Sequence, residues 1–210
     1  LGKTEMWVVL DAAPEAAIIF GLAKEVSRER LEKAINSGNV EEFLNKVAIR
    51  RGDHICVPAG TVHAILGGAM IAEIQQNSNV TYRLFDWNRT DDTGKSRELH
   101  VDKALDVINY EQVGCALPKP DIIASTKDLI RQRLCRNEYF TTERILLQPG
   151  GVFHGDCDGS SLEIWGVIDG EAVVAGLPLS AIRFVLLPAR LGSFAVQASR
   201  KTVLMRTFTE

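Results

Sequence analysis

Short runs of alternating apolar and polar residues dominate the first half of the chain. Residues 3–10 alternate as a β-strand would, with Glu5, Trp7 and Val9 on one face. Gly, Asn and Pro residues separate this run from further predicted strands at 17–21, 54–58, 61–66, 69–76 and 80–87. Because short strands divided by such turn residues are typical of antiparallel barrels and sandwiches, the pattern predicts a mainly β fold.

A helical periodicity interrupts these strands between residues 24 and 48. Ser27 can cap a first helix, and Gly38 ends its pattern. The apolar positions of the first helix are Leu31, Ala34 and Ile35, and those of a second helix are Val40, Phe43, Leu44 and Val47. We therefore expect a short helical insertion among the strands of the first half.

A Pro-Lys-Pro sequence at residues 118–120 is the best candidate for a linker. A short helix is predicted before it, at 101–108. Strands return after it, at 140–147, 162–168, 171–175, 184–187 and 202–208. The two halves look like two similar β units, although sequence identity alone reveals no repeat. We therefore predict a first unit over residues 1–117 and a second over residues 118–210.

Composition and charge exclude several classes of protein. The chain has 46% apolar and 24% charged residues, which are ordinary globular values. The formal net charge is −3 and neither half is basic, which argues against a nucleic-acid partner. No apolar run approaches the ~20 residues of a membrane helix. The four cysteines are widely spaced and no signal segment follows Leu1, so we expect a cytoplasmic protein without a disulfide framework.

Four polar side chains on the predicted strands are candidates for chemistry. Glu5 and His63 have side chains that can ligate a metal, and Glu73 and Arg83 lie on later strands. If the faces that carry them line one barrel interior, the four meet in one pocket, where charge is costly unless paired or metal-bound. The pattern does not fix which face points inward. Glu73 and Arg83 can equally form a cross-strand ion pair, and His63 can be a hydrogen-bonded structural residue.

Three segments carry a resemblance to a known family. They read Gly-Lys-Thr-Glu-Met-Trp at 2–7, Pro-Ala-Gly-Thr-Val-His-Ala-Ile at 58–65 and Glu-Ile-Gln-Gln-Asn-Ser-Asn-Val-Thr-Tyr-Arg-Leu-Phe-Asp-Trp at 73–87. In this order and spacing they resemble the bacterial type I mannose-6-phosphate isomerases, zinc enzymes of the cupin superfamily. The resemblance covers nearly the whole chain. It implies two cupin-like antiparallel β-barrel or jelly-roll units.

The resemblance also implies roles for particular residues. Glu5 and His63 match the family's metal ligands, Arg83 matches an arginine assigned to catalysis, and Lys3 and Glu73 match polar residues of its pocket. On chemical grounds Glu73 is a better base than Arg83, because arginine is effectively always protonated. The family takes a further metal ligand from a Gln-x-His-Pro type motif, and this chain has no His-Pro pair. We therefore expect one Zn²⁺ per chain, with a further ligand from a missing N-terminal segment, unless the chain is a shortened natural paralogue.

The activity that the resemblance implies is an aldose–ketose isomerisation. Such an enzyme interconverts mannose 6-phosphate and fructose 6-phosphate through a metal-stabilised enediol, so the expected partner is a small sugar phosphate. Two alternatives stay open. One is a non-catalytic sugar-binding cupin, and the other is a different metal-dependent cupin enzyme, for example one that holds Fe(II) for oxygen chemistry.

Overall fold

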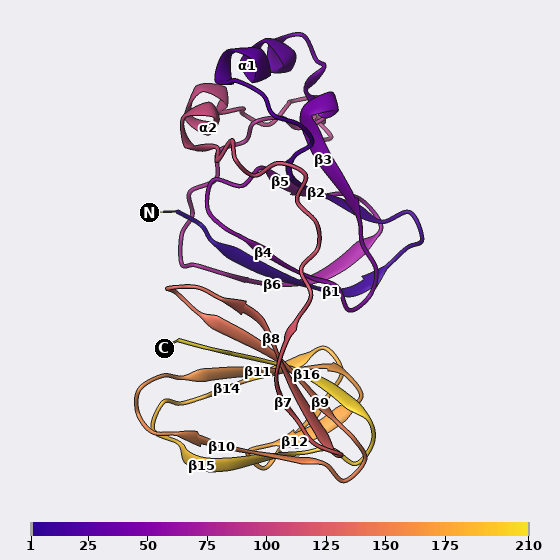
Figure 1. The fold of residues 1–210 in the computed structure, drawn as a ribbon, viewed down its shortest axis with the longest axis vertical. Coiled ribbons are helices and arrows are strands. Elements are labelled where there is room, and N and C mark those ends of the chain that lie inside the picture. Colours follow the sequence, from indigo (N-terminus) through magenta and orange to yellow (C-terminus); the bar gives the residue numbers. More distant parts are fainter. Residues whose placement is uncertain (1, 210) are drawn as a thin grey trace. The chain divides into compact units, whose positions relative to one another are not determined.

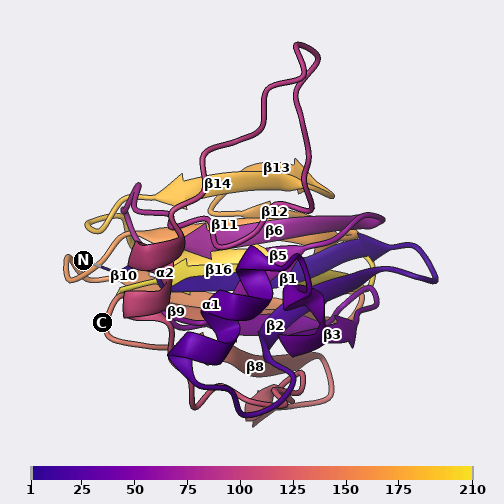
Figure 2. The ribbon, with the colours of Figure 1, turned by 90° about the horizontal axis from the view of Figure 1, so that it is seen from above.

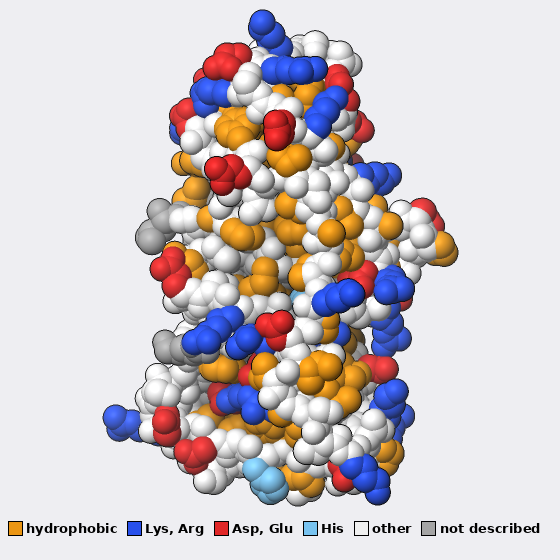
Figure 3. Space-filling model, viewed as in Figure 1, with side chains coloured by type: hydrophobic (Ala, Val, Ile, Leu, Met, Phe, Trp, Pro, Cys, Tyr) orange, Lys and Arg blue, Asp and Glu red, His pale blue; other side chains and the backbone are white. Residues whose placement is uncertain are grey.

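The computed structural model describes residues 2–209 and divides this chain into two compact units, Leu1–Leu117 and Pro118–Glu210. Both units consist mainly of antiparallel strands, so the mainly β fold expected from the sequence is confirmed (Figure 1). Acidic and basic side chains intersperse on the face drawn in Figure 3, in keeping with the small net charge of −3. Across residues 2–209, no helix has the length and apolarity that a membrane crossing requires.

The described part of the first unit contains two three-stranded sheets, with strand orders β4-β1-β6 and β3-β2-β5. Their strands are β1 (Glu5–Ala12), β2 (Ala17–Leu22), β3 (Leu44–Ala48), β4 (His54–Val57), β5 (His63–Ile65) and β6 (Ala69–Gln75). Apolar side chains from both sheets form one core, which includes Trp7, Val9, Ile18 and Ile55. This core holds β1 of one sheet against β2 of the other, and the candidate site lies at the beginning of β1 and of β5 and near the end of β6.

The helical insertion is shorter than the sequence predicts. The helix α1 (Arg28–Asn36) begins after Ser27, whose hydroxyl accepts a hydrogen bond from the Arg30 N–H at 3.3 Å. The predicted second helix is wrong: the structure has a single 3₁₀ turn, η1 (Val40–Phe43), and then enters β3. Pairing of β3 with β2 accounts for this difference, because tertiary strand pairing outweighs a weak local helical preference.

A strand predicted at residues 80–87 is also absent. Residues 76–100 have no strand or helix apart from an isolated bridge between Thr90 and Ser96, and Figure 2 shows this segment extending away from the strands of its unit. Its apolar side chains Leu84, Phe85 and Trp87 instead pack on the cluster around α1 and α2 (Val101–Val107). The apolar alternation thus reflects packing on a helical layer rather than membership of a sheet.

In the second unit, the strands described up to residue 209 form a six-stranded sheet, β14-β11-β16-β9-β8-β7, and a four-stranded sheet, β10-β15-β12-β13. They are β7 (Asp121–Ser125), β8 (Leu129–Arg136), β9 (Thr141–Leu147), β10 (Val152–Cys157), β11 (Glu163–Asp169), β12 (Glu171–Val174), β13 (Leu177–Ser180), β14 (Arg183–Leu187), β15 (Gly192–Gln197) and β16 (Thr202–Phe208). Trp165, Phe153, Phe194 and Leu204 belong to the core of this unit. The sequence patterns missed β7, β8, β10, β13 and β15.

Candidate active site

A buried carboxylate and a histidine from different sheets of the first unit lie next to each other. Glu5, at the start of β1, is 3% exposed, and its Oε2 accepts a hydrogen bond from the Trp7 indole Nε1 at 2.9 Å. His63, at the start of β5, places its Nε2 3.7 Å from the same Oε2. The rings of Trp7 and His63 pack edge to face, with centroids 5.4 Å apart. Folding of the two sheets against each other therefore creates this pair.

The orientation of His63 suits a metal ligand. Its Nδ1 lies 2.8 Å from the carbonyl oxygen of Thr61, so Nδ1 carries the proton and donates it to that oxygen. In the neutral ring the lone pair is then on Nε2, the atom that faces Glu5. Metal-binding histidines commonly donate their second ring N–H to a carbonyl in this way. Glu5 and His63 therefore fit two positions of a zinc site in residue type and in orientation.

Lys3 and Glu73 extend the pair into a four-residue cluster. The Lys3 Nζ lies 3.1 Å from Glu5 Oε1 and 3.9 Å from Glu73 Oε1. Glu73 reaches this position because β6 pairs with β1 in a register that sets Glu73 opposite Trp7. Partial burial, and secondly the Glu5 carboxylate, raise the pKa of Glu73, while Lys3 and His63 oppose the shift. A raised pKa is typical of a carboxyl group that exchanges protons with a substrate.

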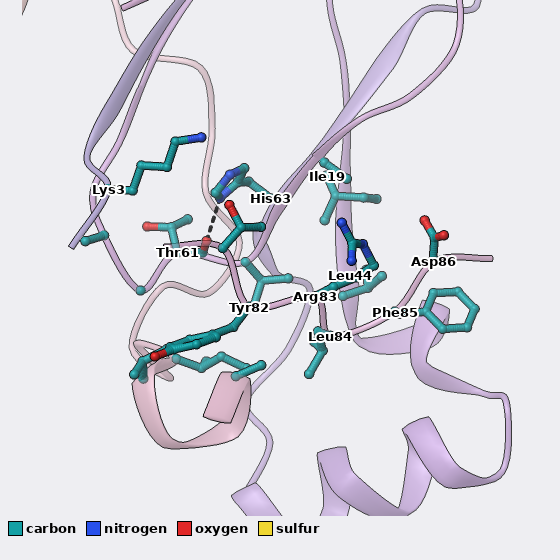
Figure 4. Close-up of a pocket in the computed structure, with 18 of the residues that line it drawn as sticks. Lys3, Ile19, Leu44, Thr61, His63, Tyr82, Arg83, Leu84, Phe85 and Asp86 are labelled. Atoms are coloured by element: carbon teal, nitrogen blue, oxygen red, sulfur yellow. Dashed lines mark hydrogen bonds between the residues drawn. The ribbon is translucent and has the colours of Figure 1, made fainter. Parts of the chain in front are cut away.

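Arg83 reaches the same pocket from the irregular segment. The pocket has a volume of about 790 Å³, and its walls include Lys3, Glu5, His63 and Arg83 (Figure 4). The Arg83 Nη1 donates to the carbonyl oxygen of Glu98 at 2.9 Å, which fixes the guanidinium within the segment. The pocket thus brings together four of the five residues singled out in the sequence. Glu73 adjoins it through Lys3 and does not line its wall.

Sequence reasoning missed four further polar residues of this pocket: Thr61, Asp86, Arg89 and Arg97. Arg97 forms two hydrogen bonds to the buried Asp86, which lower the pKa of that carboxyl group. Arg89 lies over the Trp87 ring, with its guanidinium carbon 5.3 Å from the centroid. The hydroxyl of Thr61 is buried and has no hydrogen-bond partner among the described residues. The two arginines belong to a polar stretch that reads as a surface loop, so no local signal marks them.

The described chain does not complete a metal site. Zinc takes four ligands, usually three protein side chains and one open position in catalytic sites. Within residues 2–209, no group of three or more His, Cys, Asp and Glu side chains is arranged to hold a metal ion. Glu5 and His63 are thus a partial donor set, and the nearby Glu73 has its Oε1 3.9 Å from Lys3 Nζ.

The fold and this pocket define a cupin-like protein with two mainly β units and a polar site inside the first. Proteins with similar sequences are named mannose-6-phosphate isomerases. The mannose-6-phosphate isomerase ManA of Bacillus subtilis is 33% identical over 210 residues, covering 97% of this chain and 64% of that protein. The mannose-6-phosphate isomerase of Streptococcus mutans is 42% identical over 118 residues, which are 56% of this chain and 37% of that protein.

Solved structures with a similar fold carry the same kind of name. The crystal structure of the Bacillus subtilis mannose 6-phosphate isomerase matches with a TM-score of 0.83 and 32% identity, over 99% of this chain and 65% of that one. A putative mannosephosphate isomerase from Archaeoglobus fulgidus shares the fold, with a TM-score of 0.72 and 19% identity. No family model matches the chain. The resemblance to mannose-6-phosphate isomerases is confirmed. Nearly all of this chain aligns with the two curated Bacillus relatives, and it spans slightly less than two thirds of their length.

Proposed function

We propose that this chain provides most of the active site of an isomerase that interconverts mannose 6-phosphate and fructose 6-phosphate. The observation that carries the proposal is the cluster of Lys3, Glu5, His63 and Glu73 beside one pocket, in a chain homologous to proteins of that name. The reaction moves a proton between C2 and C1 of the sugar through an enediol. It therefore needs a group that moves the proton and positive charge near the developing oxyanion.

Glu73 is the group that moves the proton in this proposal. Burial and the Glu5 carboxylate raise its pKa, so its basicity as a carboxylate is greater than that of an ordinary glutamate. Lys3 lies within 4 Å of both carboxylates and can donate to a sugar oxygen or return a proton. Arginine carries a positive charge in proteins, so Arg83 acts by holding oxygens of the sugar or the enediolate.

Glu5 and His63 would hold the zinc ion of this proposal. A zinc ion supplies Lewis-acid polarisation of the sugar carbonyl. The 3.7 Å between His63 Nε2 and Glu5 Oε2 leaves room for one ion at the usual ~2.0–2.2 Å from each atom. Residues 2–209 contain no third donor at the site, so a further protein ligand would have to come from sequence outside them. The relatives are longer than this chain, which leaves sequence in them to supply it.

The phosphate and hydroxyl groups of the sugar need partners on the same wall. Arg89 has no ion pair within 4 Å in the described part of the chain, whereas Arg97 is held by Asp86. Arg89 is therefore available to meet a phosphate group. The unpartnered hydroxyl of Thr61 lies on the pocket wall beside His63 and would bond to a sugar hydroxyl.

Isomerase assays test this proposal directly. Purified protein is assayed on fructose 6-phosphate with added Zn²⁺ and with a chelator, and the full reading frame from the same source is assayed in parallel. We expect turnover in the full reading frame that depends on Zn²⁺ and falls by at least about 100-fold in Glu73→Gln. Glu15→Gln is the matched control, because Glu15 is exposed at the turn between β1 and β2. A fully active Glu73→Gln would remove Glu73 from the reaction.

Zinc binding separates a metal role from a structural one. Glu5→Gln and His63→Phe should each lower the bound zinc measured by elemental analysis, whereas Arg83→Ala should lower turnover with the zinc content unchanged. Loss of zinc in Arg83→Ala would make Arg83 a structural residue. Binding of the sugar phosphate without turnover in the full reading frame would instead favour a non-catalytic sugar-binding protein.

A further inference from the structure

The strand that carries Glu5 has a counterpart in the second unit. Residues 5–11 and residues 163–169 both read Glu-x-Trp-x-Val-x-Asp. In β11 the Trp165 Nε1 donates to Glu163 Oε2 at 2.7 Å, as the Trp7 Nε1 donates to Glu5 Oε2 at 2.9 Å in β1. Both glutamates are buried, with 4% and 3% exposed. The same motif therefore makes the same internal hydrogen bond in each unit.

The strands around the two motifs are connected in the same way. The order β4-β1-β6 in the first unit matches β14-β11-β16 in the second, and β3-β2-β5 matches β13-β12-β15. The bulges also agree. The pairing of β1 with β6 shifts between Val9 and Asp11, and the pairing of β11 with β16 shifts between Val167 and Asp169. These six strands are therefore a structural repeat, and the pairing register identifies equivalent residues.

The repeat differs in the residue opposite the tryptophan. Trp7 pairs with Glu73 across β1 and β6, and Trp165 pairs with Arg206 across β11 and β16. Arg206 thus occupies the position of Glu73 with the opposite charge. This exchange changes the surroundings of the repeated carboxylate, because the residue opposite the tryptophan is now a cation beside Glu163 rather than a second carboxylate.

The guanidinium of Arg206 takes up both oxygens of Glu163. Its Nε donates to Glu163 Oε2 at 2.8 Å, its Nη2 donates to Oε1, and its Nη1 donates to Glu143 Oε2 at 3.3 Å. Arg131 completes the network with two hydrogen bonds from its Nη2 to Glu143, at 2.8 and 3.0 Å. The Arg206 side chain is 13% exposed and lies over the Phe208 ring at 4.3 Å. Two buried carboxylates are therefore neutralised by two arginines of the same unit.

We propose that the second unit contains a closed copy of the active-site scaffold, in which Arg206 supplies the positive charge that Lys3 and the proposed metal ion would supply beside Glu5. A buried carboxylate needs a counter-charge, and the planar guanidinium matches both of its oxygens. Arg206 thereby fills the cation position and holds β9, β11 and β16 together. The comparison of Arg206 with a metal ion beside Glu5 rests on the proposed function. The assignment of Arg206 to Glu163 stands on the second unit alone.

Hydrogen exchange of the intact chain tests the assignment. Arg206→Met leaves Glu163 without its cation, so we expect the amides of β9, β11 and β16 to exchange at least about tenfold faster than in the unsubstituted protein. Adding Glu163→Gln to the same chain removes the unpaired charge and should restore slow exchange. This result is expected because the fast exchange of Arg206→Met is caused by the unpaired carboxylate and not by the lost packing of the arginine. Arg183→Met, an exposed arginine of β14, is the matched control. Exchange in the double variant that is as fast as in Arg206→Met would overturn the proposal.

A second arm uses Zn²⁺ as the probe and separates the two proposals. In the unsubstituted protein, Zn²⁺ should leave exchange in β11 and β16 unchanged, because Arg206 already fills the cation position. In the full reading frame, the proposed function predicts slower exchange in β1 and β5 when Zn²⁺ is added. Slower exchange in β11 and β16 would overturn the closed copy. Unchanged exchange everywhere would count against the metal of the first unit only, and the double variant would still decide the role of Arg206.

Discussion

The two Glu–Trp pairs allow one prediction to be developed with an internal control. Trp7→Phe removes the indole N–H that donates to Glu5, and Trp165→Phe removes the same donor to Glu163. Both tryptophans are buried in the core of their unit, with 2% and 0% exposed, so the loss of ring volume is comparable. The two carboxylates differ in the contacts that they keep after the indole donor is removed. Glu5 keeps Lys3 at 3.1 Å, whereas Glu163 keeps hydrogen bonds from Arg206 to both oxygens.

The expected costs follow from these contacts. The smaller ring leaves a void of about 40 Å³, worth about 1 kcal/mol in either unit. In the first unit, the lost hydrogen bond to a weakly compensated carboxylate adds about 1.5–3 kcal/mol. In the second unit, the carboxylate is already neutralised, and the lost bond adds about 1 kcal/mol, as for a neutral pair. We therefore expect Trp7→Phe to cost about 3 kcal/mol and Trp165→Phe about 2 kcal/mol.

The assay is equilibrium unfolding in urea, followed by far-ultraviolet circular dichroism in the presence of a chelator, so that bound metal does not contribute. Unfolding in two steps would be fitted with one free energy for each unit. Glu5→Gln combined with Trp7→Phe completes a double-mutant cycle that isolates the Glu5–Trp7 hydrogen bond. If Trp165→Phe costs as much as Trp7→Phe or more, the argument that Arg206 neutralises Glu163 is wrong.

Three further predictions concern the pocket and the fold. Glu73 must be deprotonated to act as a base, and its pKa is raised, so the acid limb of kcat/KM against pH should lie above the range of an ordinary glutamate and disappear in Glu73→Gln. Arg89→Ala should raise KM for fructose 6-phosphate with a smaller change in kcat, and Arg89→Lys should recover part of the loss; unchanged KM would remove Arg89 from the phosphate site. Ser27→Ala removes the cap of α1 and should lower the free energy of unfolding by about 1 kcal/mol in urea, whereas no loss would show that the cap is not stabilising.

Local patterns were sufficient for much of the fold. Alternation and turn residues placed β1, β2, β4, β5 and β6 near their observed positions, and the capping Ser27 and the apolar spacing placed α1. They failed at 40–47 and at 80–87. In the first case, pairing with β2 turned a helical pattern into a strand, and in the second, packing on the helical layer used an alternating pattern without a sheet. Neither partner is visible to a short window of sequence.

The sequence also identified the main residues of the candidate site but not its geometry. Glu5, His63, Glu73, Arg83 and Lys3 were found from residue type and from the three motifs of the sequence. The distances between these residues could not be found from the sequence, because Glu5 and His63 lie in different sheets and Glu73 reaches them only through the register of β6 on β1. Arg89 and Arg97 lie outside these motifs, and Thr61 lies within one of them, which does not reveal that its hydroxyl is unpartnered.

The sequence by itself determined the mainly β character, the helical insertion and the side chains available for chemistry, because these depend on residue type and local spacing. Only the tertiary structure decided which carboxylate meets which cation. Glu5 and Glu163 lie in the same seven-residue motif, yet one faces Lys3 and His63 and the other faces Arg206. His63 and Arg206 come from strands far away in the sequence from the carboxylates that they face, and strand pairing over such separations is fixed by the register of whole sheets.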